Sequence, residues 1–204
     1  MSALIFLKIF FVCLLGAISP GPSMVVVINN AIFKNRYHGI LTSLGHGIGI
    51  GLYALFAVLG IALIIKTNVT LFNGMKFMSI VFLIYLGIKS IAGVKNLDFN
   101  KKDLNGVATS FLQGLSISLL NPKIFIWFLA IYSQFMSINN DIIFNICLIL
   151  TASIVDAVWY ITLTFLVTSK GALKFIKDKS ILFQQLIGGV FILIGTVLLI
   201  QIYI

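Results

Sequence analysis

Asp156 is the residue of this sequence best placed to do proton chemistry. It lies near the middle of a long apolar segment, whereas the other four acidic residues, all aspartates, lie in or near predicted loops. A charged side chain at that depth costs at least about 2.5–3.5 kcal/mol, so the Asp156 carboxyl should face the protein interior or water. Lys123 is the basic residue predicted at a comparable depth. We expect Asp156 and Lys123 to form an intramembrane pair that takes up and releases protons; a static ion pair joining two helices is the alternative.

Two proline-centred breaks point to a substrate site. Residues 19–22 (Ser-Pro-Gly-Pro) and 121–123 (Asn-Pro-Lys) interrupt apolar stretches at corresponding places in the two halves of the chain. Proline removes a backbone donor and clashes with the preceding turn, so each break should interrupt a membrane-spanning helix near the middle of the bilayer. Interrupted helices at matching positions indicate the binding site of a secondary transporter. Two kinks that only shape the helix bundle are the alternative.

The helix segments that follow Pro20 and Pro122 should present unpaired amide groups and the positive end of a helix dipole, which binds carboxylates. With Lys123 beside them and Asp156 available for an ammonium group, the two breaks could hold a zwitterion. The predicted substrate-binding residues are Pro20, Gly21, Pro22, Asn121, Pro122, Lys123 and Asp156. The predicted proton-coupling residues are Asp156, Lys123 and His46, so coupling should lie mainly in the C-terminal half. His46 stands among glycines and could instead make a polar contact between helices.

The composition is that of an integral membrane protein. Of the 204 residues, 60% are hydrophobic and 9% are charged, and the mean hydropathy is +1.15. A soluble domain would carry roughly 25% charged residues. The apolar runs predict an all-α protein with six membrane-spanning helices, of which the first and fourth are broken. These spans lie at about 4–32, 38–65, 71–93, 108–132, 141–168 and 181–203.

The basic residues predict how the chain is oriented in the membrane. Ten of the fourteen fall in three alternate loops, around residues 34–36, 89–102 and 170–179. By the positive-inside rule these loops are cytoplasmic and both termini are external. Three spans in each half, 1–100 and 101–204, then make the chain an inverted repeat in which Pro22 corresponds to Pro122. A reporter fused to the C-terminus should be active only on the external side, and a cytoplasmic C-terminus would overturn this topology.

Several kinds of site are not expected. The histidines, cysteines and carboxylates do not have metal-ligand spacing, and no nucleotide-binding motif occurs. We therefore predict no metal site, no cofactor and no enzymatic activity. The net charge of +9 is concentrated in loops beside the membrane, which indicates orientation and not nucleic-acid binding.

A set of short motifs occurs in a fixed order along almost the whole chain. They are Pro20-Gly21-Pro22, Gly39 and Gly45, residues 85–89 (YLGIK), residues 111–114 (FLQG) before Asn121-Pro122-Lys123, residues 134–135 (QF), and Gly188 with Gly195. In this order they resemble the lysine exporter (LysE/RhtB) superfamily. The resemblance implies efflux of amino acids or close derivatives across the bacterial cytoplasmic (inner) membrane, by proton antiport with alternating access.

The resemblance also implies an amino-acid substrate and protons as partners. The composition makes the lipid bilayer a further partner, and a six-helix chain with short loops could pair as a homodimer. A single intramembrane acid supplies only one negative charge, whereas a substrate such as lysine carries two positive charges. We therefore favour a neutral amino acid. Two alternatives stay open. A membrane thiol or electron carrier of related inverted-repeat architecture would need a cysteine at matched positions of both halves, but Cys13 is matched by Gln113. A passive channel cannot be separated from a carrier by sequence.

Overall fold

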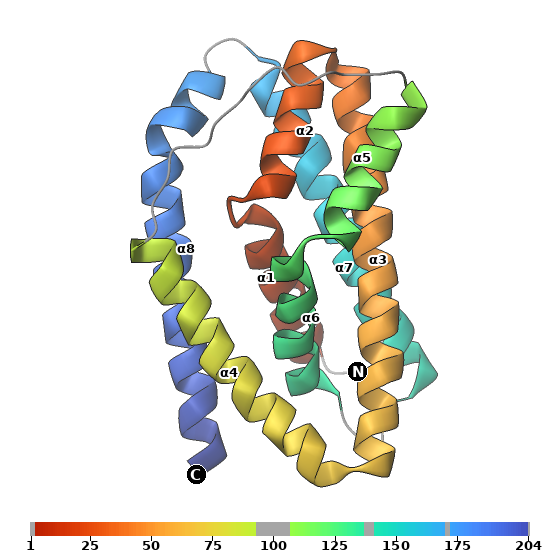
Figure 1. Ribbon diagram of the computed structural model, residues 1–204, viewed down its shortest axis with the longest axis vertical. Helices are drawn as coiled ribbons and strands as arrows, with labels where there is room; N and C mark the ends of the chain where they lie inside the picture. Colours follow the sequence, from red (N-terminus) through yellow and green to blue (C-terminus); the bar gives the residue numbers. More distant parts are fainter. Residues whose placement is uncertain (1–2, 93–106, 137–140, 170–171, 204) are drawn as a thin grey trace.

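Eight α-helices make up the part of the chain that the structure, a computed structural model, describes: residues 3–92, 107–136, 141–169 and 172–203. No strand occurs in these ranges, as the prediction of an all-α protein requires. The helices are α1 (Ala3–Ile18), α2 (Pro22–Phe33), α3 (Arg36–Thr67), α4 (Val69–Ala92), α5 (Val107–Leu119), α6 (Pro122–Phe135), α7 (Ile142–Val167) and α8 (Ala172–Tyr203). Figure 1 shows them as a bundle elongated along one axis.

Four of these helices are long and apolar enough to cross a membrane, within the described ranges. They contain the segments Arg36–Ile61, Val69–Ala92, Ile142–Val167 and Ile181–Ile200, and the bent pair of α1 and α2 raises the number to five if it is one span. α5 has 13 residues and α6 has 14. At about 1.5 Å per residue neither reaches across a hydrocarbon core of about 30 Å. The sixth span would need α5 and α6 together and stays a prediction.

Both proline motifs break a helix at the predicted place. α1 and α2 meet at an angle of 66°. Pro22 is the first residue of α2 and Pro122 is the first residue of α6, a position where the missing N–H costs nothing. The helix that follows the first break was expected to start directly after Pro20, but α2 starts at Pro22.

The two broken segments run in opposite directions and meet near the middle of the bundle. In Figure 1, α1 and α2 rise from the lower half to the top, whereas α5 and α6 descend from the top. The breaks are in direct contact, because Asn121 Nδ2 donates to Ser23 Oγ (3.4 Å) and Lys123 Nζ donates to Ser19 Oγ (2.5 Å). The two breaks therefore meet, as expected, and their common depth in a membrane stays a prediction.

Glycines let α3 approach both of its main neighbours closely. A Cβ atom on Gly114 of α5 would come within 2.9 Å of the backbone nitrogen of His46, and one on Gly47 of α3 would come within 2.6 Å of the Ala157 Cβ atom of α7. The Ser153 hydroxyl also donates to the Gly47 carbonyl across the α3–α7 interface (2.8 Å). Larger residues would push the helices apart. The glycines around His46 therefore set how near it lies to α7.

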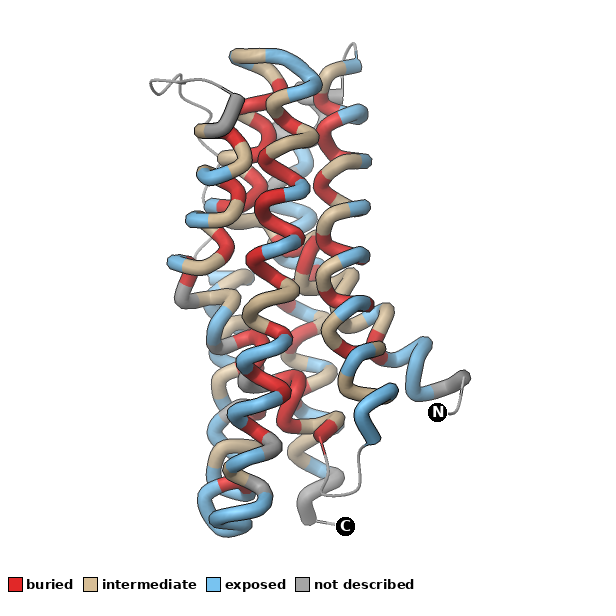
Figure 2. The backbone as a smooth tube through the Cα atoms, turned by 90° about the vertical axis from the view of Figure 1, so that its right-hand side faces the viewer, coloured by how far each residue is buried: buried red, intermediate tan, exposed pale blue. Residues whose placement is uncertain are grey.

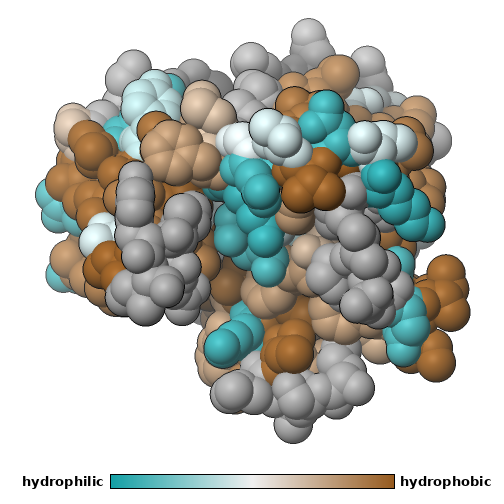
Figure 3. All heavy atoms as spheres, turned by 90° about the horizontal axis from the view of Figure 1, so that it is seen from below, coloured by the Kyte–Doolittle hydropathy of each residue, from teal (hydrophilic) through white to brown (hydrophobic). Residues whose placement is uncertain are grey.

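Burial follows the helix faces. Figure 2 shows buried residues along the inward faces and exposed residues along the outer ridges. Many of the exposed residues are large and apolar, such as Phe56, Leu59 and Leu63 at 60% to 63% exposure. At the lower end of the bundle, Figure 3 shows hydrophilic side chains in separate islands among hydrophobic ones. An apolar outer surface of this kind suits a lipid bilayer.

Some predicted features differ from the structure or lie outside it. α8 begins at Ala172, well before the predicted start at residue 181. The apolar run begins only after Lys179, whereas the helix also includes the preceding charged residues Lys174, Lys177 and Asp178, because lysine is a good helix former. Residues 93–106 and 170–171, which include four basic loop residues and the boundary between the two halves, lie outside the described residues.

Candidate functional site

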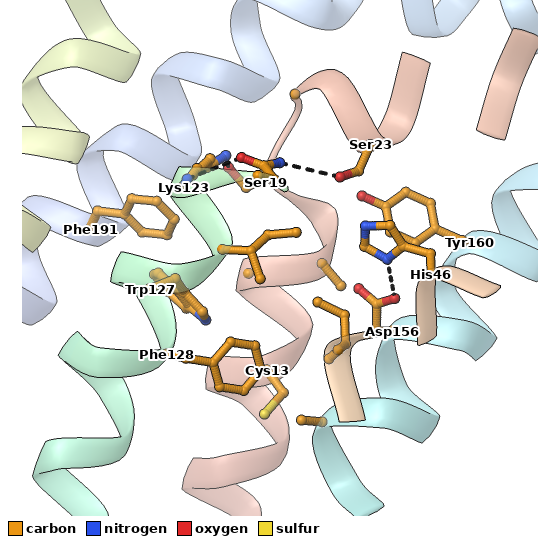
Figure 4. Close-up of a pocket in the computed structure, with 17 residues that line it drawn as sticks. Cys13, Ser19, Ser23, His46, Lys123, Trp127, Phe128, Asp156, Tyr160 and Phe191 are labelled. Carbon is orange, nitrogen blue, oxygen red and sulfur yellow. Dashed lines mark hydrogen bonds and ion pairs between the residues drawn. The ribbon is translucent and has the colours of Figure 1, made fainter. Parts of the chain in front are cut away.

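A cavity of about 60 Å³ lies beside both helix breaks. α1, α2, α3, α6, α7 and α8 all contribute to its wall (Figure 4). At roughly 10–15 Å³ per water, it has room for a few water molecules. Its polar lining residues are Ser19, Ser23, His46, Asn121, Lys123, Asp156 and Tyr160.

Asp156 of α7 pairs with His46 of α3. The carboxylate Oδ2 and the imidazole Nδ1 are 2.6 Å apart, and the two residues are only 5% and 1% exposed. A buried acid beside a buried imidazole can hold a proton on either partner. The pair takes one residue from each half of the chain, and the location of proton coupling stays a prediction.

The predicted direct pair between Asp156 and Lys123 is wrong. Lys123 Nζ donates instead to Ser19 Oγ and, at 3.5 Å, to the Pro20 carbonyl. Both charged residues line the same cavity, but from different helices and different sides (Figure 4). The sequence gives the depth of a residue in the membrane; the rotation of each helix decides which neighbour it meets.

The second ring nitrogen of His46 is left without a hydrogen bond in the described part of the chain. Nε2 is buried and has no hydrogen-bond partner among the described residues. An unpaired buried nitrogen costs about 1–3 kcal/mol, which is a reason to look for a ligand, water or proton there. His46, predicted as a proton relay or a helix contact, therefore has one nitrogen in a helix contact and a second one available.

The two helix starts at the breaks differ in how they are capped. The Asn121 side chain accepts from the Lys123 backbone N–H (3.0 Å) and so caps α6. Gly21 precedes α2 and supplies no side-chain cap. A Cβ atom on Gly21 would lie 3.8 Å from Lys123 Nζ, so the uncapped start of α2 faces the lysine ammonium group. An uncapped helix start beside a cation suits a carboxylate.

The opposite part of the cavity is apolar. In Figure 4, Trp127 and Phe128 of α6 and Cys13 of α1 lie below the row formed by Lys123, Ser19 and Ser23. The Trp127 ring packs against Phe191 of α8, with centroids 4.9 Å apart. The cavity therefore has polar groups at the breaks, the His46–Asp156 pair on the α3 and α7 side, and an apolar wall on the α6 and α1 side.

The structure brings the predicted site residues together around one point. Gly21, Asn121, Lys123, His46 and Asp156 line the cavity. Pro22 and Pro122 start the helices beside it, and the Pro20 carbonyl contacts Lys123.

Sequence reasoning did not include Ser19, Ser23 and Tyr160 among the site residues. A signal was available for each of them. The serines flank the first proline break, and Tyr160 stands four residues after Asp156, which places it on the same face of a helix.

A second set of polar residues, two of them buried and three half-buried, joins α2, α3 and α5 near the upper end of the bundle. We name it the α2–α5 polar cluster; its members are Asn30, Lys34, His38, Ser110 and Gln113. Asn30 Nδ2 donates to Gln113 Oε1 (2.8 Å), and Lys34 Nζ donates to Ser110 Oγ (2.8 Å). His38 Nδ1 lies 2.9 Å from the same hydroxyl. Asn30 is 1% exposed and Ser110 is fully buried, whereas Lys34, His38 and Gln113 are half-buried, so these partly buried bonds join α2 and α5 at this end of the bundle.

A known protein family matches most of the chain. The LysE type translocator family matches residues 14–202, which include both helix breaks and the His46–Asp156 pair. The chain belongs to the LysE type translocator family. Members of this family are transporters, which fits the prediction that the chain is not an enzyme.

Individual relatives agree with the family assignment. The uncharacterized membrane protein YrhP of Bacillus subtilis is 30% identical over 193 residues, covering 87% of this chain and 89% of the relative. The uncharacterized membrane protein slr1627 of Synechocystis is 30% identical over 197 residues, covering 96% and 95%. The leucine efflux protein of Klebsiella pneumoniae is 26% identical over 179 residues, covering 85% and 84%. No solved structure matches the chain.

Proposed function

We propose that this LysE-family protein exports a neutral amino acid from the bacterial cytoplasm by proton antiport with alternating access. One observation carries the proposal: the cavity where the two helix breaks meet holds a lysine ammonium group on one side and a buried acid–histidine pair on another. These are complementary to the two charged ends of an amino acid. The substrate carboxylate binds at Lys123 and the uncapped start of α2, and its ammonium group binds at Asp156.

The apolar wall of the cavity takes the side chain of the substrate. Trp127, Phe128 and Phe191 offer no charged partner there, which favours an apolar side chain. Relatives named leucine efflux protein support the same substrate class. The present cavity has room for a few waters only, so a leucine-sized substrate requires lining side chains to move.

The substrate ammonium group and a proton compete for Asp156, and this competition couples export of the amino acid to entry of the proton. The carboxylate can hold the substrate ammonium group or, with His46, a proton, but desolvation in the membrane disfavours leaving it charged and unpaired. Release of the substrate on one side is therefore accompanied by uptake of a proton. Six spans in two inverted halves, with both termini external, would place the cavity between the halves and let them rock about it.

The proposal is tested by counterflow in proteoliposomes over the twenty amino acids. Purified protein is reconstituted, the vesicles are loaded with one unlabelled amino acid, and uptake of the same labelled amino acid is measured. We expect counterflow for leucine and amino acids of similar size and polarity, and little for lysine or glutamate. Absence of counterflow for every amino acid would contradict the proposed function.

Alternating access also requires closures on both sides of the cavity, and we propose the α2–α5 polar cluster as the cytoplasmic one. It lies at the end of the bundle where α2 meets α3 beside Lys34 and Arg36, on the side predicted to be cytoplasmic. α2 and α5 are also the two half-helices that lead from that side to the breaks. Parting their cross-helix hydrogen bonds would open a path to the cavity.

A reversible cross-link tests this closure. We expect the double variant Asn30→Cys with Gln113→Cys, made in a protein with Cys13 and Cys147 replaced by serine, to lose transport on oxidation and regain it on reduction. The two side chains it replaces are hydrogen-bonded across the α2–α5 contact at 2.8 Å. A disulfide needs Cα atoms within about 7 Å of each other, so its formation is verified by the loss of free thiols before transport is measured. Either single cysteine variant should be insensitive to oxidation. Full transport by the cross-linked protein would show that α2 and α5 need not separate.

A further inference from the structure

We infer that Tyr160 is a positioning residue that transmits the protonation state of the His46–Asp156 pair to the two helix breaks. The inference rests on the proposed proton-coupled function and adds a residue that links the coupling pair to the substrate end of the cavity. Tyr160 lies on α7, one helical turn after Asp156, and is 3% exposed. Its position between the pair and the breaks is visible in Figure 4.

Tyr160 contacts the proton pair through its ring. The ring packs edge-to-face on His46, with centroids 4.8 Å apart and planes at 67°. His46 is held by Asp156 through Nδ1, so a change in the proton shared by that pair changes the preferred orientation of the imidazole. In a close-packed interior the imidazole cannot turn without displacing the ring that packs on it.

Tyr160 contacts the breaks through its hydroxyl. In Figure 4 the hydroxyl group points toward the side chain of Ser23, the second residue of α2. Ser23 in turn accepts a hydrogen bond from Asn121, which caps α6. A displacement of the tyrosine is thus passed to the starts of both half-helices, where the substrate carboxylate is proposed to bind.

Few other ionisable groups surround this path. The titratable side chains that line the cavity with Tyr160 are Cys13 from α1, His46 from α3, Lys123 from α6 and Asp156 from α7. α2 and α8 contribute the uncharged side chains Ser23 and Phe191 to the wall. Tyr160 packs on His46 and its hydroxyl faces Ser23, so the hydroxyl is the link that a substitution can remove.

The test compares Tyr160→Phe with Tyr132→Phe in proteoliposomes. Both substitutions remove one hydroxyl from a buried tyrosine, but the Tyr132 hydroxyl donates to the Leu148 carbonyl (2.9 Å) and does not line the cavity. Two rates are measured for each variant: counterflow of the amino acid, which moves no net charge or proton, and net export driven by an imposed pH gradient. The readout is the ratio of gradient-driven export to counterflow.

We expect this ratio to fall at least about tenfold in Tyr160→Phe and to stay at the wild-type value in Tyr132→Phe. Ser23→Ala removes the hydroxyl that Tyr160 faces and should lower the ratio similarly, so the inference can still be tested if the Tyr160→Phe protein does not fold. An unchanged ratio in the Tyr160 and Ser23 variants, or an equal loss of both rates, would overturn the inference. A wild-type protein that shows counterflow but no response to a pH gradient would instead overturn the proposed proton coupling.

Discussion

Replacing Asp156 with asparagine is expected to abolish gradient-driven export while the protein remains in the membrane. Asparagine has nearly the same shape and can accept a hydrogen bond from the His46 ring, but it cannot take up a proton. Asp156 is the acidic residue of the candidate spans, so no neighbouring carboxyl replaces it. Because asparagine keeps the hydrogen bond with the His46 ring, His46 is not left without a partner and the protein should stay folded in the membrane.

Export driven by an imposed pH gradient is measured alongside counterflow and the amount of protein in the membrane. We expect the gradient-driven rate to fall at least about tenfold. Asp141→Asn is the matched control, because that aspartate caps α7 by accepting from the Phe144 backbone N–H (2.6 Å) and lies away from the cavity. It should leave the response to pH at the wild-type level. Gradient-driven export by Asp156→Asn at the wild-type rate would leave the His46–Asp156 pair with a structural role alone.

Replacing Lys123 with methionine is expected to weaken substrate binding strongly. Methionine fills similar volume but lacks the ammonium group that we propose to hold the substrate carboxylate. A hydrogen bond to a charged group contributes about 1.5–3 kcal/mol, so the half-saturating amino-acid concentration should rise about 10- to 150-fold. The measurement is the concentration dependence of counterflow.

A substrate analogue without a carboxylate tests whether Lys123 recognises that group. The wild-type protein should prefer an amino acid to the amine that lacks its carboxylate, and Lys123→Met should lose that preference. Lys76→Met is the control, because Lys76 lies over the Phe72 ring of α4 (4.7 Å), away from the cavity. If Lys123→Met retains both the wild-type half-saturation and the preference for the carboxylate, the ammonium group does not bind the substrate.

Features governed by local backbone chemistry could be predicted from the sequence. Proline has no backbone N–H, so both helix breaks fall where Pro22 and Pro122 start a new helix. Hydropathy likewise places α3, α4 and α7 within a few residues of the predicted spans. The start of α8 was misplaced because an apolar run marks where a chain enters a membrane, whereas a helix can extend beyond it.

The partners of buried groups could not be predicted in the same way. Asp156 and Lys123 were paired because they are the charged residues at mid-depth, but helix rotation directs Asp156 to His46 and Lys123 to Ser19. That rotation depends on close approaches such as the one at Gly47, which a single sequence does not reveal. Tyr160 was within reach of prediction, since a spacing of four residues from Asp156 puts both side chains on one helix face.

The most direct test of the account is whether amino-acid export by the wild-type protein moves protons in the opposite direction. Proteoliposomes are loaded with the labelled amino acid that gives the strongest counterflow and with a pH-sensitive dye, and are diluted into buffer without substrate. The account predicts that efflux acidifies the vesicle interior, that an acidic external buffer accelerates efflux, and that Asp156→Asn removes both effects. Amino-acid efflux at an unchanged rate, with no proton entry and no response to the pH gradient, would contradict it.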